Sequence, residues 1–235
     1  RTLERWQQEG ILIEDEEPCY YLYELVMEGR SQTGIVACAS VDDYSSGAIA
    51  RHENTRAEKE EDRIRHVDVT NAHTGPIFLA YRSREELNNL AEQEKKNPPL
   101  YDFTSEDGIS HRVWKIGDPK KTEEIHRIFS GISRIYIADG HHRAASAARV
   151  AAMRREANPS WTGNEEFNYF LSVLFPDDQL MIMPYNRVVQ DLNGLTREEF
   201  LKKAEVCFTV TERGSQAFTP EKKGQAGMYL GGIWY

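Results

Sequence analysis

An apolar run that ends in Asp-Gly and continues into an alanine-rich segment constrains the fold of this chain more than any other stretch. Residues 135–138 (Ile-Tyr-Ile-Ala) favour a strand, and alanine, which dominates residues 144–148, is the strongest helix former. Gly140 permits a sharp reversal because glycine adopts positive φ at little steric cost. The pattern therefore predicts a strand, a tight turn at Asp139-Gly140 and a helix that begins near His142.

The predicted turn gathers groups that can bind an anion. The first turn of a helix offers free N–H groups and a partial positive charge, and Arg143 adds a planar cation suited to phosphate or carboxylate. Asp139 places a carboxylate at the edge of this site, and His141 and His142 add imidazoles. A turn or capping role explains Asp139 equally well, so both interpretations stay open. Adjacent histidines are poorly spaced as zinc ligands, and no Cys lies nearby.

Composition limits the classes of protein to consider. A chain of 235 residues can form one large domain or two small ones. Its formal net charge of −9 argues against bulk electrostatic binding of nucleic acid, so we regard nucleic acid as an unlikely partner. The three cysteines (Cys19, Cys38 and Cys207) are far apart, which predicts free thiols in a cytoplasmic protein. No apolar run approaches the roughly 18 residues needed to span a membrane, so no membrane partner is expected.

Hairpins alternate with helices along the chain, which favours an α+β fold over a doubly wound parallel sheet. Asp107-Gly108 is the strongest hairpin signal, and Thr55 and Thr196 each precede a glutamate at the capping-box spacing. We expect strands at 20–26, 32–41, 77–81, 101–103, 109–116, 169–175, 180–183 and 208–211, helices at 1–9, 83–95 and 121–129 and from 55 and 196, and a turn at 42–47.

We expect three regions along the chain. Residues 1–50 form an N-terminal hairpin region, which we expect to continue a longer N-terminal segment because the sequence starts with a mid-helix pattern. Residues 51–155 form the core that contains the Asp-Gly turn. Residues 156–235 form a C-terminal α+β region packed on that core.

A second group of candidate site residues lies just before the helix expected at Thr55. Most of that helix is charged and indicates a solvated face. His52 and Glu53 precede it, where side chains can reach a pocket, and a carboxylate beside an imidazole is a candidate general base. Arg187 follows a Pro-Tyr-Asn turn and faces either the site or the solvent.

Several motifs together resemble a bacterial family catalogued as domain of unknown function 1015, whose members often carry automatic ParB-like names. The resemblance rests on the Asp-Gly-His-His-Arg turn and on the following runs: Arg51-His52-Glu53-Asn54-Thr55, Tyr101-Asp102-Phe103, Asp107-Gly108, His111-Arg112, Trp114-Lys115-Ile116, Leu174-Phe175-Pro176-Asp177-Asp178 and Pro184-Tyr185-Asn186-Arg187. It therefore extends through most of the chain.

The same turn also resembles the phosphate-handling turn of the ParB/sulfiredoxin superfamily, and within it the Asp-Gly-His-x-Arg turn of free-serine kinases. Those enzymes phosphorylate L-serine with ADP or ATP and magnesium. The resemblance implies a ParB/sulfiredoxin-like core with a mixed sheet, hairpins and flanking helices. It also implies roles for individual residues: a nucleotide-phosphate site at Gly140, His141, His142 and Arg143, catalytic roles for Glu53, Asp139 and His141, magnesium at Asp139, and substrate contacts from His52, Thr55 and Arg187.

Three hypotheses follow. The leading one is a small-molecule kinase whose partners are a nucleotide, ADP or ATP with Mg²⁺, and a free hydroxyl amino acid, first of all L-serine. The alternative is a non-catalytic ParB-like regulatory module that binds nucleotide. A third is a metal-dependent hydrolase that uses His52, His141 and His142. DNA-binding ParB proteins carry a more basic turn and a helix-turn-helix domain, and this sequence shows neither.

Overall fold

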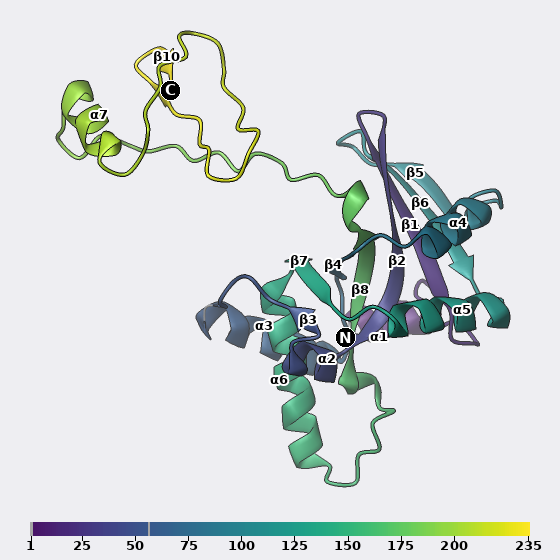
Figure 1. Ribbon diagram of the computed structural model, residues 1–235. Helices are drawn as coiled ribbons and strands as arrows, with labels where there is room; N and C mark the ends of the chain where they lie inside the picture. Colours follow the sequence, from purple (N-terminus) through teal and green to yellow (C-terminus); the bar gives the residue numbers. More distant parts are fainter. Residues whose placement is uncertain (1, 56) are drawn as a thin grey trace. The chain divides into compact units, whose positions relative to one another are not determined.

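The predicted α+β class is confirmed by a computed structural model, which describes residues 2–55 and 57–235 (Figure 1). Residues 1 and 56, which fall in two of the predicted helices, lie outside the described residues. The described chain forms two compact units, the first ending at Met181 and the second comprising Ile182–Tyr235. Each unit is described by itself below.

In the described part of the first unit, eight strands form one mixed sheet in the order β3-β7-β4-β8-β2-β1-β6-β5. Their bounds are β1 (Tyr20–Met27), β2 (Arg30–Ser40), β3 (Ile49–Ala50), β4 (Ile77–Tyr81), β5 (Tyr101–Thr104), β6 (Ser110–Ile116), β7 (Ile135–Asp139) and β8 (Tyr169–Pro176). The pairs β3·β7 and β4·β8 are parallel and the other neighbours are antiparallel. The predicted mixed sheet is therefore present.

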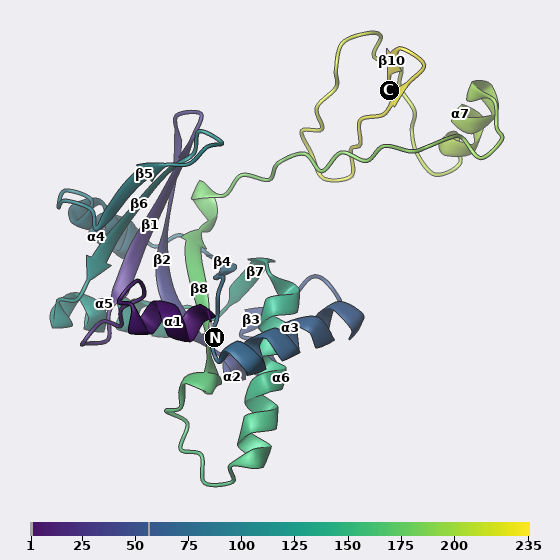
Figure 2. The ribbon, with the colours of Figure 1, turned by 180° about the vertical axis from the view of Figure 1, so that it is seen from behind.

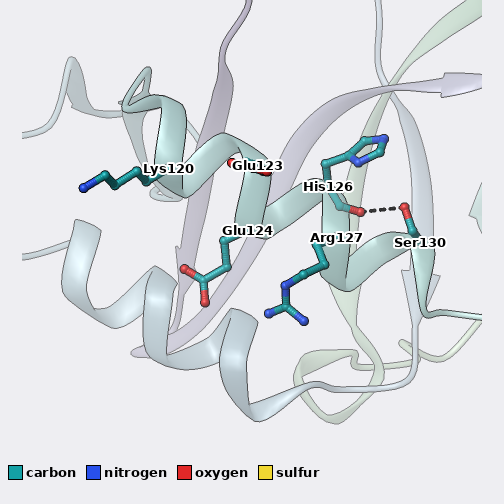
Figure 3. A pocket seen from close by; sticks show the side chains of 6 residues that line it. All are labelled: Lys120, Glu123, Glu124, His126, Arg127 and Ser130. Carbon is teal, nitrogen blue, oxygen red and sulfur yellow. Dashed lines mark hydrogen bonds between the residues drawn. The ribbon is translucent and has the colours of Figure 1, made fainter.

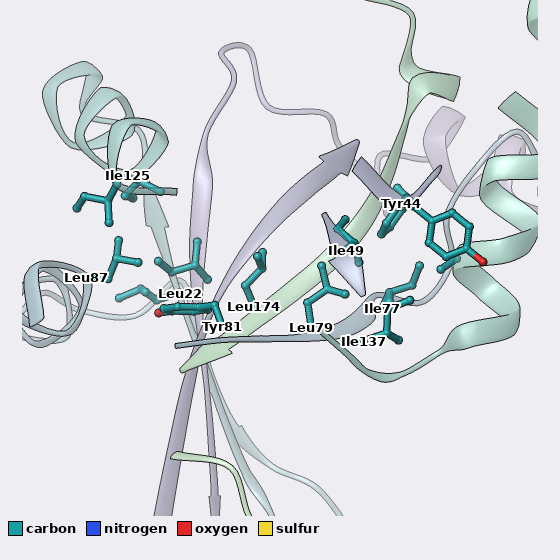
Figure 4. Close-up of a cluster of buried hydrophobic side chains, with 14 of the residues drawn as sticks. Leu22, Tyr44, Ile49, Ile77, Leu79, Tyr81, Leu87, Ile125, Ile137 and Leu174 are labelled. Atoms are coloured by element: carbon teal, nitrogen blue, oxygen red, sulfur yellow. The ribbon is translucent and has the colours of Figure 1, made fainter. Parts of the chain in front are cut away.

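The hydrophobic core includes a row of residues that pair directly with one another on neighbouring strands. One row of registered partners crosses six strands and comprises Trp114, Leu22, Ile35, Leu174, Leu79 and Ile137. Each of these side chains is at most 5% exposed. Because strand side chains alternate between faces, the row defines one buried face of the sheet, which Figure 4 shows with the helices packed on it.

The helices of the first unit are α1 (Thr2–Gln8), α2 (Val41–Ser46), α3 (Ala57–Thr70), α4 (Glu85–Glu94), α5 (Pro119–Ser130) and α6 (His141–Ala157), with short 3-10 turns η1 (Glu166–Asn168) and η2 (Asp177–Gln179). Among the described residues, α2, α4, α5 and α6 contribute side chains to the hydrophobic core, whereas α1 has no buried residue. Figure 4 shows Leu87 of α4 and Ile125 of α5 together at one end of this cluster, and Ala144 and Ala147 of α6 belong to the same cluster. No helix in the described part of the chain combines the length and apolar character needed to cross a membrane.

The second unit is small. It contains α7 (Arg197–Glu205) and the hairpin strands β9 (Tyr229–Leu230) and β10 (Ile233–Trp234). The predicted capping box at the start of α7 is confirmed, since Thr196 accepts from the Glu199 backbone N–H and the Glu199 carboxylate accepts from the Thr196 backbone N–H.

The structure corrects three sequence expectations. Residues 42–47 belong mostly to helix α2, which Ser40 caps and Gly47 ends at φ 85°, rather than to a simple turn. Residues 180–183 and 208–211, predicted as strands from their apolar and β-branched residues, are irregular and form no ladder. Neither segment pairs with a described strand. Without such pairing, β propensity alone does not stabilise a strand.

The first unit joins residues that the sequence analysis assigned to three regions. Strand β8, which lies beyond residue 155, pairs with β2 from the N-terminal region and with β4 from the expected core. The sheet therefore draws strands from all three expected regions.

Candidate functional site

Three of the predicted site residues meet beside the N-terminus of α6. His52 and Glu53 lie in the segment between β3 and α3, and His141 is the first residue of α6. The His141 Nδ1 lies 3.7 Å from Glu53 Oε2, and the rings of His52 and His141 meet edge to face with centroids 4.4 Å apart. Tertiary structure thus brings together two motifs that are far apart in the sequence.

His141 is the buried member of this cluster. Its side chain is 4% exposed, whereas that of Glu53 is 60% exposed. Burial first, and then the neighbouring His52, lower the pKa of His141 below its usual value, so the imidazole is neutral at neutral pH. Its Nε2 atom is buried without a hydrogen-bond partner among the described residues. A buried polar atom left unpaired is costly and is typical of a site that a ligand or water completes.

Helices α3 and α6 both begin near this cluster. The hydroxyl oxygen of Ser146, in the second turn of α6, lies 3.4 Å from the carbonyl oxygen of Glu60 in the first turn of α3. Further along, Arg154 of α6 donates to the carbonyl of Asp68 near the end of α3 (3.3 Å). Because these contacts advance together along both helices, their first turns lie at the same end of the packed pair.

The predicted strand–turn–helix at Asp139-Gly140 is confirmed, with α6 starting one residue earlier than expected. Gly140 has φ 96°, the left-handed region that favours glycine. Arg143 folds back over this turn, donating from Nη2 to Asp139 Oδ2 (2.8 Å) and from Nη1 to the Pro76 carbonyl (2.6 Å). A Cβ at position 140 would lie 3.0 Å from Arg143 Nη2. Glycine at 140 is therefore needed both for the turn and for the guanidinium beside it.

The sequence analysis did not assign a site role to Gly75-Pro76, although this pair holds Arg143 in place. A Cβ at Gly75 would lie 3.3 Å from Arg143 Nη1, next to the Pro76 carbonyl that accepts from it. In the sequence, Gly75-Pro76 indicates only the end of one secondary-structure element and the start of another. The group that accepts from Arg143 is a backbone carbonyl, which every residue has. The identity of residue 76 therefore could not predict this contact.

Three other predicted site residues, Thr55, His142 and Arg187, make contacts outside the cluster of His52, Glu53 and His141. Thr55 donates from its hydroxyl to the Glu60 carboxylate (2.8 Å) rather than capping through Glu58, and α3 begins at Ala57. His142 is half-buried, and its carbonyl accepts from the Ser146 hydroxyl (2.6 Å). Arg187 belongs to the second unit, where its guanidinium lies 5.0 Å from the centroid of the Tyr185 ring.

The metal chemistry open to this cluster is limited. No group of three or more His, Cys, Asp or Glu residues among those described is placed to hold a metal ion, which gives no support to the hydrolase hypothesis. Magnesium, in contrast, is commonly held by one or two carboxylates together with substrate phosphates. Asp139 is 73% exposed and keeps one carboxylate oxygen beyond its bond to Arg143, so it fits such a site.

A separate hollow of about 570 Å³ lies on α5 and involves none of these residues (Figure 3). Its lining comprises Lys120, Glu123, Glu124, His126, Arg127 and Ser130, all from one helix. The Ser130 hydroxyl is satisfied by the His126 carbonyl (2.8 Å). Charges of both signs along a single exposed helix indicate a solvated surface rather than a reaction site.

The comparisons with known proteins identify the family alone. No curated protein and no solved structure matches the chain. A family model described as "Protein of unknown function (DUF1015)" matches residues 1–235, so the chain belongs to the DUF1015 family.

Proposed function

We propose that this chain is a small-molecule phosphotransferase that moves a phosphoryl group from ADP or ATP to a free hydroxyl amino acid, with L-serine as the first acceptor. The observation that carries the proposal is the approach of Glu53 to His141 at the start of α6, the helix whose first turn also carries Arg143. Phosphoryl transfer requires a phosphate clamp, neutralisation of charge and an oriented hydroxyl. This cluster has residues suited to each requirement.

The phosphate clamp is the N-terminus of α6 together with Arg143. The first helical N–H groups and the helix dipole favour an anion at this end. Arg143 uses two of its five N–H donors on Asp139 and the Pro76 carbonyl, so three remain for phosphate oxygens. Those two bonds also orient the guanidinium, which lowers the entropy lost when a phosphate binds.

Glu53 is the residue suited to accept the proton of the acceptor hydroxyl. Its carboxylate is mostly exposed, so it can reach a bound hydroxyl group, and the imidazole beside it is neutral.

The magnesium proposal rests on Asp139. Bound with the nucleotide, Mg²⁺ would neutralise charge on the transferring phosphate. Asp139 would hold it through the carboxylate oxygen that Arg143 does not use. Arg143 and Asp139 thus also fix each other's orientation at the phosphate site.

Phosphorus NMR of the chain incubated with Mg²⁺, L-serine and either ADP or ATP tests the proposal. We expect O-phosphoserine to accumulate, and Glu53→Gln to slow its formation by about 100-fold or more, since general-base catalysis contributes on that scale. Nucleotide affinity, measured by calorimetry, should stay within about twofold, because the substitution leaves the phosphate clamp intact.

Glu61→Gln is the matched control, because Glu61 is an exposed carboxylate within α3. It should turn over like the unmodified chain. Full activity of Glu53→Gln would remove Glu53 from the role of base. Nucleotide binding without phosphorylation of L-serine or any other hydroxyl amino acid would contradict the kinase proposal and favour the regulatory module.

A further inference from the structure

Strand β5 is an exposed edge of the main sheet. Its partner is β6, and no other described strand pairs with it. All four residues of β5 are exposed, and large apolar side chains gather there: Leu100 is 52% exposed, Tyr101 57% and Phe103 54%. Figures 1 and 2 show β5 at the outer side of the strands labelled β6 and β1.

This edge lacks the usual protection against pairing. Natural edge strands are commonly protected by short length, by charged side chains (above all lysine), by proline or by bulges. The opposite edge, β3, has two residues. Strand β5 has neither lysine nor proline, and its one charge, Asp102, is neutralised by Arg112 of the neighbouring strand, with Nε 3.3 Å from Oδ1. A second edge can therefore approach β5 without an unpaired charge.

The ring of Phe103 is exposed, and its orientation is fixed by neighbouring side chains. Its ring stacks on His111 of β6, with centroids 4.9 Å apart and planes 17° apart. His111 is fixed on both sides, because Nδ1 lies 2.7 Å from the Tyr23 hydroxyl and Nε2 lies 2.9 Å from the Ser105 hydroxyl. An aromatic ring immobilised while more than half exposed loses little further entropy on association, which suits it as an interface anchor.

We propose that β5 pairs antiparallel with β5 of a second copy of this chain, which joins two sheets across a two-fold axis. A two-fold interface places the same strand on both sides, and antiparallel pairing is the only arrangement that such an axis allows for two edge strands in one sheet. The proposal is independent of the proposed activity.

Side-chain chemistry selects the register. With the axis beside Phe103, the two Phe103 rings face each other, and Asp102 faces Thr104 of the second copy, a pair that can hydrogen-bond. With the axis beside Asp102, two aspartates would face each other, and with the axis beside Thr104, Asp102 would face Glu106. Like charges directly opposite destabilise a sheet, so the Phe103-centred register is favoured.

The mass of the chain in solution, measured by light scattering during size exclusion, is the first test. We expect twice the mass of one chain, and Phe103→Lys should return it to the mass of one chain, because two ammonium groups would face each other. Val69→Lys is the control, since Val69 is 78% exposed on α3. A monomeric chain at high protein concentration, or a Phe103→Lys variant that stays dimeric, would overturn the proposal.

Cross-linking tests the register without depending on a destabilising variant. In a background with Cys19, Cys38 and Cys207 changed to serine, Phe103→Cys should form a disulfide with itself under mild oxidation. Residues directly opposite in an antiparallel pair have Cα atoms roughly 4.5–5.5 Å apart, within the span of a disulfide. Thr104→Cys, on the same exposed strand, should cross-link more slowly, because residue 104 faces Asp102 of the second copy and its own counterpart lies beyond the span of a disulfide. Equal rates for the two variants would refute this register.

Discussion

Gly140→Ala tests the turn between β7 and α6, on which both the fold and the position of Arg143 depend. The residue has φ 96°, so a Cβ there meets the steric penalty of the left-handed region, about 1–2 kcal/mol. The new Cβ would also lie 3.0–3.2 Å from three atoms of the Arg143 guanidinium, which would have to move. That movement weakens the bonds of Arg143 to Asp139 and to the Pro76 carbonyl, which adds about 1 kcal/mol for a partly exposed group.

Gly108→Ala separates the two contributions. Gly108 has φ 80°, and a Cβ added there would have no neighbouring atom within 4 Å, so this substitution carries the backbone penalty alone. In urea titrations followed by circular dichroism, Gly140→Ala should lower the free energy of unfolding by about 1 kcal/mol more than Gly108→Ala does. Nucleotide affinity should fall for Gly140→Ala and stay unchanged for Gly108→Ala. Equal losses of stability, with equal nucleotide affinity, would refute the placement of Arg143 against Gly140.

Two further substitutions test packing and pH dependence. Gly34→Ala should lower the free energy of unfolding by about 1–3 kcal/mol, because its Cβ would lie 2.7 Å from Val173 Cγ1 on the neighbouring strand, whereas Gly117→Ala, with its nearest contact at 3.8 Å, should cost far less in the same urea titration. Hydrogen bonds from the Thr162 and Gly163 backbone lower the pKa of Glu165 from 4.5 to about 2, so its contribution to stability is present above pH 4.5 and is lost as the pH falls toward 2. Glu165→Gln should therefore reduce the fall in melting temperature between about pH 5 and pH 2.5, and an unchanged fall would contradict the role of this carboxylate.

Local signals predicted the elements whose stability is local. Asp107-Gly108 marks the hairpin of β5 and β6 because a tight turn needs a residue that adopts positive φ, and Gly108 has φ 80°. Thr196 and Glu199 mark the start of α7 because each side chain satisfies a backbone group of the other. The strand, turn and helix around Gly140 were predictable for the same reason.

Elements that depend on a distant partner were predicted less well. Residues 180–183 and 208–211 have strand-like composition but pair with no strand, and the short helix α2 is stabilised by Val41 and Tyr44 in the core. The same residues that raise β propensity also serve in irregular segments, so composition alone could not separate these outcomes.

The sequence by itself determined which chemical groups are available to this protein. They are a glycine at a turn that requires positive φ, an arginine four residues after an aspartate, and a glutamate next to a histidine. Only the tertiary structure decided which of these groups meet. The packing of α3 on α6 places Glu53 3.7 Å from His141, the Pro76 carbonyl orients Arg143, and burial makes His141 neutral. Such contacts depend on the path of the whole chain, because no local periodicity or propensity specifies the distance between residues far apart in sequence.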